Sequence, residues 1–292
     1  MKNKNYKKIL EKAKEQFALM LFPARCPVCD ELLAPEERIE NNKEDTTKKR
    51  TISFARKPKG IHLNCDTKLH YVISPVCMHC GRPIENDVWE YCYDCQRKRS
   101  KIGRQNRKAV FQNIQPSKGG TWGNSFDQGK AIFLYKGALK KTLYRFKYSN
   151  KREYAQFFAT EAQRIYGDWI ASKEIDCIMP VPMYLKKMNL RGYNQAESFA
   201  KALSKLTQIP MEKNLVQRIK DTAPQKMLND IERKNNLKNA FQKTKSIVQY
   251  RHILVVDDIY TTGSTADAVA EELKNAGAEE VYFLSIGIGK GM

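Results

Sequence analysis

Two adjacent aspartates precede a loop of small residues in the segment VVDDIYTTGST, residues 255–265. The neighbouring carboxylates, Asp257 and Asp258, can accept hydrogen bonds from the vicinal hydroxyls of a ribose. The loop after them opens a helix, and backbone N–H groups at a helix N-terminus bind phosphate. An acidic turn that only caps a helix would explain Ser264 and one aspartate, but not both acids. The pattern therefore predicts a ribose 5-phosphate site, with five phosphate-binding residues: Thr261, Thr262, Gly263, Ser264 and Thr265.

Eight potential metal ligands lie in the first third of the chain, in four pairs whose members are separated by two residues. A C-x2-C step lets two thiolates reach one tetrahedral ion, and a second pair closes the shell. Such sites leave no position for water, so we expect one or two structural rather than catalytic zinc ions. The spacing does not decide which pairs share an ion. His62 could also be an ordinary surface histidine that binds no metal. The predicted ligands are Cys26, Cys29, His62, Cys65, Cys77, Cys80, Cys92 and Cys95.

The remaining cysteine, Cys177, stands alone in the apolar run IDCIMPVP and is expected to be a small core residue. Paired cysteines in a reducing compartment bind metal more often than they form disulfides. No apolar run approaches the roughly 18 residues of a membrane span. The basic N-terminus has neither an unbroken apolar stretch nor a cleavage site. We therefore expect a cytoplasmic protein with no membrane span.

The elements that must position these residues alternate along the second half of the chain. Buried strands are expected at AIFLY, DCIMPVP, ILVVDDI and VYFLSIGI, and helices at GALKKTLYRFKY, REYAQFFATEAQRIY, NQAESFAKALSKL and STADAVAEELKNAG. This alternation favours an α/β fold, with a mostly parallel sheet and flanking helices on both faces. Ligands bind such folds at the C-terminal edge of the strands, where ILVVDDI carries its acid pair.

The chain is strongly basic, with 52 Lys and Arg against 32 Asp and Glu, a formal net charge of +20. An excess of this size favours a polyanionic partner such as nucleic acid. Alternatively, the same excess of positive charge would only keep a lysine-rich protein soluble. The two interpretations differ in whether nucleic-acid binding is present and weakens with salt.

Residues 253–265 resemble the signature for 5-phosphoribosyl-1-pyrophosphate (PRPP) in type I phosphoribosyltransferases: four apolar residues, two acids and a T-x-G-x-T-like loop. The resemblance implies PRPP with Mg²⁺ as ligand, a 5-phosphate held by the loop, ribose hydroxyls held by the acids, and a separate pyrophosphate loop. A candidate for that loop is MYLKKMNLRGYNQAE, although a plain basic loop has the same composition. Within it, Asn194 and Glu197 have the spacing of a helix capping box. Its predicted pyrophosphate-binding residues are Lys186, Lys187, Arg191 and Gly192.

The order of the motifs narrows the resemblance. A cysteine-rich region, then LRGYNQAESFA, then APQKMLNDIERKNNLKNAF and the PRPP signature resemble the ComF family of competence-associated bacterial proteins, from Phe22 to about Ile288. The chain differs from the family at His62, where a cysteine is usual, and in a long charged insertion. The resemblance implies a role in natural transformation, with single-stranded DNA and a DNA-translocating helicase as partners. The matching residues of the third motif are Gln225, Arg233, Asn236 and Phe241.

Composition and resemblance together divide the chain into four predicted regions. These are a basic amphipathic helix (1–25), a zinc-binding module (26–95) with a charged insertion (30–60), a basic linker (96–129) and a phosphoribosyltransferase-like domain (130–292). Few residues follow Thr265, which leaves little room for a C-terminal acceptor pocket. Three functions therefore stay open: a competence factor that binds DNA and a phosphoribosyl ligand, a metabolic phosphoribosyltransferase with an unknown acceptor, and a non-catalytic scaffold.

Overall fold

The structure is a computed structural model that describes residues 23–39, 59–100, 125–221, 240–244 and 249–289. Most of the helix predicted over residues 1–25, of the insertion and of the linker falls outside these ranges. The motif residues Gln225, Arg233 and Asn236 fall outside them as well. The described N-terminal part contains the short helical elements η1 (Pro35–Glu37) and α2 (Leu63–Asp66), and residues 93–100 are helical as well.

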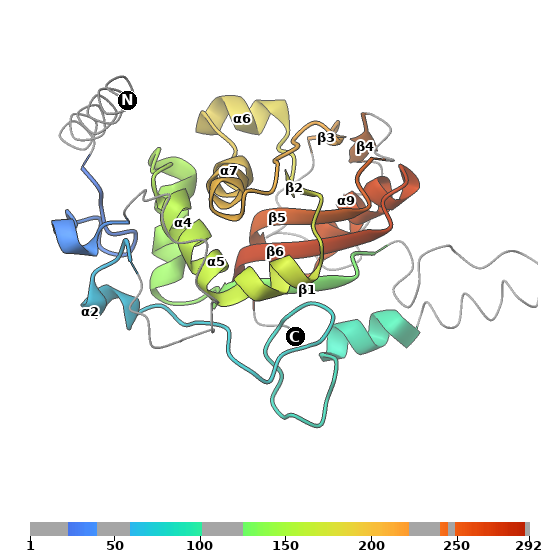
Figure 1. The fold of residues 1–292 in the computed structure, drawn as a ribbon, viewed down its shortest axis with the longest axis horizontal. Coiled ribbons are helices and arrows are strands. Elements are labelled where there is room, and N and C mark those ends of the chain that lie inside the picture. The colour runs from blue at the N-terminus through green and yellow to red at the C-terminus, as the bar shows by residue number, and fades with distance from the viewer. Residues whose placement is uncertain (1–22, 40–58, 101–124, 222–239, 245–248, 290–292) are drawn as a thin grey trace, which may run out of the picture.

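Four strands form the central sheet in the order β1–β6–β5–β2 (Figure 1). Their bounds are β1 (Gln128–Leu134), β2 (Cys177–Pro180), β5 (His252–Tyr260) and β6 (Glu280–Ile288). All three pairings are parallel, as expected when helical connections carry the chain back across the sheet between strands. The predicted α/β fold with a mostly parallel sheet is confirmed.

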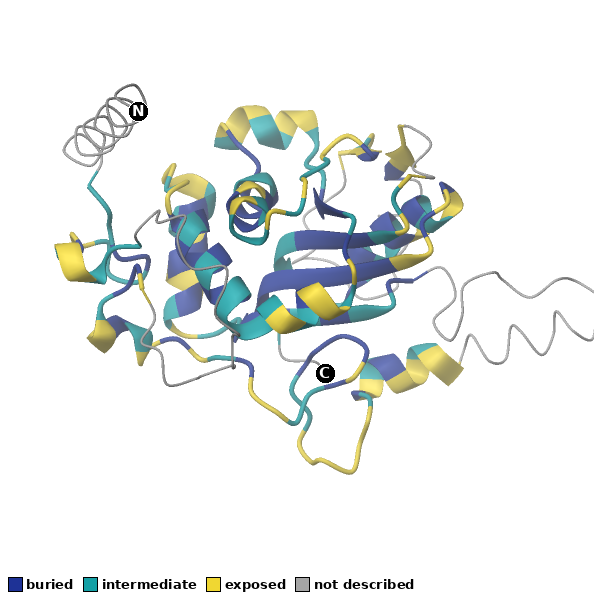
Figure 2. Ribbon diagram, in the orientation of Figure 1, coloured by how far each residue is buried: buried dark blue, intermediate teal, exposed yellow. Residues whose placement is uncertain are grey.

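Helices cover both faces of this sheet. They are α4 (Ala138–Tyr148), α5 (Tyr154–Ser172), α7 (Gln195–Thr207) and α9 (Ser264–Asn275). Leu254 and Val256 of β5 are buried against α4, α5 and α7, whereas Ile253 and Val255 are buried against α9. The strand feeds two cores because its successive side chains point to opposite faces. Figure 2 shows β5 and β6 buried along most of their length, which explains their continuous apolar sequences.

Two smaller elements lie near each other at the top of the molecule in Figure 1. The first is the short helix α6 (Leu185–Arg191), which follows β2. The second is an antiparallel pair of strands, β3 (Val216–Arg218) and β4 (Phe241–Lys243). Both elements add polar and charged side chains to the apolar frame of the sheet.

The two cysteine-containing segments pack on different parts of the sheet domain (Figure 1). Carbonyl groups of the first, within residues 23–39, accept hydrogen bonds from Arg145 of α4. The second, residues 76–95, buries its cysteines in the core that also contains α9. Within it, Gly81 has a φ of +73°, and a Cβ there would lie 2.7 Å from the carbonyl oxygen of Gly129. Only glycine therefore permits this close approach of the second segment to β1.

Candidate functional site

The acid pair lies near the C-terminal end of β5. The pairing of β2 with β5 ends at Pro180 and Val256, immediately before Asp257, while β6 continues alongside β5 on the other side. The backbone N–H of Asp258 donates a hydrogen bond of 2.8 Å to the Asp257 carboxylate. The two acids therefore stand at the edge of the sheet where α/β folds bind ligands.

A lysine from α4 partly neutralises this pair. The Nζ atom of Lys147 lies 2.9 Å from a carboxylate oxygen of Asp258. Burial acts to lower the pKa of Lys147, but the charge and hydrogen bond of Asp258, together with the charge of Asp257, leave that pKa raised. Burial, and next the charge of Asp258, raise the pKa of Asp257 to about 7, against the opposing charges of Lys147 and Arg218. One acid is thus held in an ion pair while the other titrates near neutral pH.

Ionised Asp257 should destabilise the folded protein, so the free energy of unfolding should fall as pH rises. The ordinary pKa of Asp257 is 3.8, and folding raises it to about 7. The protonated carboxyl therefore stabilises the folded state fully below about pH 4, and this stabilisation is lost as pH rises through 7. Asp257→Asn should raise the free energy of unfolding at pH 8 by up to a few kcal/mol, since one pKa unit corresponds to about 1.4 kcal/mol. Near pH 4 the two proteins should be equally stable. Urea unfolding across this pH range measures the difference, and parallel pH profiles would contradict the assignment.

The loop after the acids turns directly into α9, as predicted. Gly263 is the N-cap residue, with a left-handed backbone at a φ of +83°. A Cβ at this position would overlap the side chain of Tyr260, so glycine suits both the conformation and the space. The hydroxyl oxygens of Thr262 and Ser264 lie 2.9 Å apart. The loop therefore places hydroxyl groups and the N-terminus of a twelve-residue helix at one place.

The segment predicted to be a pyrophosphate loop, residues 183–197, is mostly helical, which corrects its assignment as a loop. Leu185–Arg191 form α6, which ends at Gly192 in the left-handed conformation, with a φ of +75°. The sequence LKKMNLR consists mainly of good helix formers, and a left-handed glycine ends many helices. Lys186 on this helix is largely exposed. Asn194 caps the following helix α7, accepting a hydrogen bond from the backbone N–H of Ala196. Glu197 pairs with Lys213 and does not complete the predicted capping box.

Three cations from α6 and β3 interact with one another. Burial lowers the pKa of Lys187, and the positive charges of Arg218 and Arg191 lower it further, against the opposing charge of Asp221. Burial also lowers the pKa of Arg218, while the charge of Asp257 acts to raise it. The cations are therefore close enough to repel each other beside the acid pair. A bound anion would relieve that repulsion.

Sequence reasoning did not identify Lys147 or Arg218 as site residues. Lys147 lies in the stretch FKYS and Arg218 in VQR, and the chain contains 52 lysines and arginines. No local pattern separates these two from the others, because their proximity to the acids depends on how α4 and β3 pack. Of the four cations described near the acids, Lys187 and Arg191 belong to the segment predicted to bind pyrophosphate, and Lys147 and Arg218 do not.

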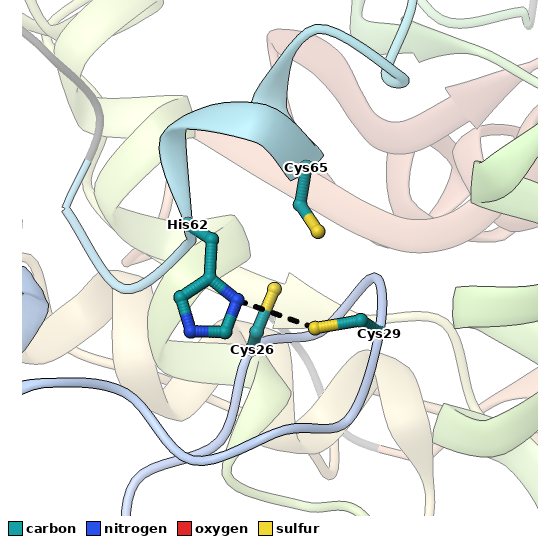
Figure 3. A group of neighbouring side chains, drawn as sticks. All are labelled: Cys26, Cys29, His62 and Cys65. Atoms are coloured by element: carbon teal, nitrogen blue, oxygen red, sulfur yellow. Dashed lines mark hydrogen bonds between the residues drawn. The ribbon is translucent and has the colours of Figure 1, made fainter.

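The first group of metal ligands is drawn in Figure 3 and consists of Cys26, Cys29, His62 and Cys65. Their ligand atoms all lie within 4.8 Å of one another. The Nδ1 atom of His62 faces the thiols, 3.2 Å from Sγ of Cys29, and its Nε2 lies 3.0 Å from the carbonyl oxygen of Leu32. A carbonyl only accepts hydrogen bonds, so Nε2 carries the hydrogen and Nδ1 can bind a metal. His62 therefore fits as the fourth ligand of a zinc ion.

The second group consists of Cys77, Cys80, Cys92 and Cys95, all of them buried. The Sγ atoms of Cys80 and Cys92 are 3.7 Å apart. Two sulfurs of a tetrahedral site with Zn–S bonds of about 2.3 Å are separated by about 3.8 Å, so the spacing fits zinc. In both groups the pairs combine in chain order, which excludes the interleaved pairing that the sequence left open.

His79 has no partner at metal-ligand spacing in the sequence, but it contacts the second group. Its Nδ1 lies 3.3 Å from Sγ of Cys95, and its Nε2 lies 2.9 Å from the carbonyl oxygen of Phe126. The imidazole also stacks on the Phe126 ring, with the ring centres 4.4 Å apart. His79 thus connects the metal group to the segment that enters β1. The sequence offered no signal for this contact, because His79 stands between two ligands of one C-x2-C step.

Comparison with known proteins agrees with the geometry. Residues 194–286, which include the acid pair and the loop, match the phosphoribosyl transferase domain. Competence protein F of Haemophilus influenzae is 30% identical over 224 residues, which are 75% of this chain and 93% of that protein. The chain belongs to the competence protein F (ComF) family. Competence protein ComFC of Streptococcus pneumoniae is 25% identical over 72% of this chain and 98% of that protein. DNA utilization protein YhgH of Escherichia coli is 39% identical over 36% of this chain and 46% of that protein.

Membership of the ComF family confirms the resemblance drawn from the motifs. The matched phosphoribosyl transferase segment begins at the N-cap of α7 and ends within β6. Lys147 precedes it, so a residue from outside the matched segment pairs with one of the two acids of this ComF chain. In the part of the chain that the structure describes, no helix is long and apolar enough to cross a membrane.

Proposed function

We propose that this ComF protein binds PRPP with Mg²⁺ at the C-terminal edge of its sheet and handles single-stranded DNA in the cytoplasm during natural transformation. The convergence of the acid pair, the phosphate loop and the cations of α6 and β3 at the end of β5 supports the proposal. Asp257 and Asp258 would accept hydrogen bonds from ribose hydroxyls. The loop of Thr261, Thr262, Gly263, Ser264 and Thr265 would bind the 5-phosphate through its N–H and hydroxyl groups.

The pyrophosphate group of PRPP would bind to the cations. Burial, and next the charges of Arg218 and Arg191, lower the pKa of Lys187, and an anion among these cations replaces repulsion by attraction. Lys186 and Gly192 flank this set on α6. A Mg²⁺ ion would supply further positive charge to the phosphate oxygens. Its preference for oxygen ligands fits PRPP and the neighbouring carboxylates.

Ribosyl transfer would require positioning and charge stabilisation rather than a side-chain nucleophile. Calorimetric titration of PRPP with Mg²⁺, followed by a pyrophosphate-release assay with a panel of acceptors, separates the possible roles. Binding without turnover supports a competence factor that senses the ligand, and turnover with one acceptor supports a metabolic transferase. No binding of PRPP at millimolar concentration would refute the proposal.

The two groups of metal ligands would each hold one structural zinc ion. Each offers four protein ligands, which fills a tetrahedral shell and leaves no open position for a reacting water. Both segments pack against the sheet domain. The zinc ions would thus shape the surroundings of the acid pair and take no part in bond breaking.

An exposed aromatic pair supports the proposed binding of single-stranded DNA. Tyr144 and Tyr148 on α4 are 64% and 57% exposed, and their ring centres are 5.0 Å apart. The guanidinium of Arg191 lies 5.0 Å from the centre of the Tyr148 ring. Bases stack on such rings while nearby cations contact phosphates. A DNA-translocating helicase of the uptake machinery is the protein partner that family membership suggests.

Replacing both tyrosines, Tyr144→Ala with Tyr148→Ala, should weaken the binding of a short oligothymidine about tenfold or more. The reason is that each stacked base contributes about 1–3 kcal/mol. Fluorescence anisotropy at several salt concentrations measures the affinity, which should fall with salt as phosphates are neutralised. Charge reversal within residues 96–108 should make the affinity less dependent on salt concentration.

Tyr93→Ala is the matched control, because Tyr93 is an exposed tyrosine of the second cysteine segment. This variant should bind the oligonucleotide as the wild type does. Unchanged affinity in the double variant would contradict the placement of DNA on α4. Absence of salt-dependent binding in the wild type would contradict the DNA partner itself.

A further inference from the structure

Arg82 connects the second group of metal ligands to the phosphate loop. It follows Cys80 by two positions and is only 6% exposed. Its guanidinium donates one hydrogen bond to the carboxylate of Asp94 and another to the carbonyl oxygen of Thr261. Asp94 itself stands between two ligands of the group, immediately before Cys95. A buried guanidinium needs such partners, so the position of the loop carbonyl depends on that of the metal group.

This contact fixes the direction of the peptide between Thr261 and Thr262. In a planar trans peptide the carbonyl and the N–H point in opposite directions. With the carbonyl of Thr261 held by Arg82, the N–H of Thr262 points away from the metal group. It is then one of the backbone donors that the loop offers to a phosphate.

A second connection reaches the first turn of α9. The Nζ atom of Lys98 lies 2.6 Å from Oγ of Ser125 and 2.6 Å from a carboxylate oxygen of Asp267. The hydroxyl of Ser125 donates a hydrogen bond to the same carboxylate. Lys98 follows Cys95 by three positions, and Asp267 follows Ser264, the first residue of α9, by three. The second metal group and the helical residues 93–100 that follow its Cys92 thus contact both the start of the loop and the first turn of α9.

We propose that Arg82 is a positioning residue through which metal binding at Cys77, Cys80, Cys92 and Cys95 controls the affinity for the 5-phosphate of PRPP. The inference rests on the proposed binding of PRPP. Without metal, the four thiols no longer share an ion, Arg82 and Asp94 lose their fixed separation, and the carbonyl of Thr261 is released. Because coupling between two sites is reciprocal, bound PRPP also holds the metal more tightly.

Arg82→Ala should weaken the binding of PRPP with Mg²⁺ about tenfold, as expected for the loss of a charged hydrogen bond that orients the loop. Binding of pyrophosphate with Mg²⁺, which lacks the 5-phosphate, should stay within about twofold of the wild type. Calorimetry on the zinc-loaded full chain measures both affinities, and elemental analysis should show unchanged zinc. Arg82→Lys should lose less, about threefold, because one ammonium keeps the charge but cannot bridge both partners.

Zinc release to a chromophoric chelator tests the reciprocal effect. PRPP with Mg²⁺ should slow the release of one zinc ion several-fold in the wild type, whereas pyrophosphate should not. In Arg82→Ala the slowing should disappear. The control is Arg164→Ala, which removes another largely buried arginine, paired with Glu161 on α5. It should lower stability without changing the affinity for PRPP or the protection of zinc.

The possible failures are distinguishable. A wild type that does not bind PRPP refutes the proposed function itself. Two results with a wild type that binds PRPP would overturn only this inference. Either Arg82→Ala binds PRPP as tightly as the wild type, or its affinity for pyrophosphate falls as much as its affinity for PRPP. If Arg82→Ala does not fold, the Arg82→Lys variant and the effect of PRPP on zinc release from the wild type decide the matter.

Discussion

Replacing both acids, Asp257→Asn with Asp258→Asn, is expected to reduce the affinity for PRPP with Mg²⁺ by at least about 100-fold. Each carboxylate that accepts a hydrogen bond contributes about 1.5–3 kcal/mol, and 1.4 kcal/mol is a factor of about ten in affinity. The two losses act on one ribose and leave no acid to replace them at the end of β5. The fold should survive, because relief of burial at Asp257 offsets the loss of the Lys147 ion pair with Asp258.

Calorimetric titration of the double variant measures this effect, with zinc content as the check on folding. The matched control is Glu271→Gln with Glu272→Gln, which removes the same charge from two adjacent acids of α9. That control should bind PRPP normally. Undiminished binding of PRPP by the aspartate double variant would place the ribose elsewhere.

Breaking the second metal group, Cys77→Ser with Cys80→Ser, is expected to remove one zinc ion and to unfold much of the sheet domain. The four thiols are buried in the core that contains α9 and Tyr260. Structural zinc sites contribute about 10–16 kcal/mol of apparent binding free energy, as much as the whole stability of a typical domain, about 5–15 kcal/mol. Far-UV circular dichroism on heating should therefore show a melting temperature lowered by tens of degrees, or no cooperative transition.

Two comparisons test whether this loss comes from the metal. Cys177→Ala alters a buried cysteine outside both groups and should keep both zinc ions, with a small loss of stability. Cys26→Ser with Cys29→Ser should release the other zinc ion and keep the packing of the α9 core, because that segment belongs to the core on the opposite face, with α4, α5 and α7. A Cys77 and Cys80 variant that melts like the wild type would mean that no structural ion binds there.

The agreement between sequence and structure is closest where the pattern is local. Both faces of β5 are covered by helices, so the segment ILVVDDI begins with a continuous apolar run. Its two acids follow that run and therefore lie at the C-terminal edge of the parallel sheet. The helix after the loop begins at Ser264 as expected, because Gly263 can adopt the left-handed N-cap conformation. The disagreement at residues 185–191 has a local cause as well. The basic composition suggested a loop, although the helix propensity of LKKMNLR favours the helix that forms.

The sequence by itself determined the α/β fold, the acid pair before a glycine-containing loop at a helix N-terminus, the four pairs of candidate metal ligands and the resemblance to the ComF family. These follow from residue types within a few positions of each other, which short-range geometry constrains. Only the tertiary structure decided which ligand pairs share an ion, which lysine neutralises Asp258, and that Arg82 reaches a carbonyl 179 residues further along the chain. Such contacts depend on how whole elements pack, and one lysine or arginine among 52 carries no local mark of where packing will bring it.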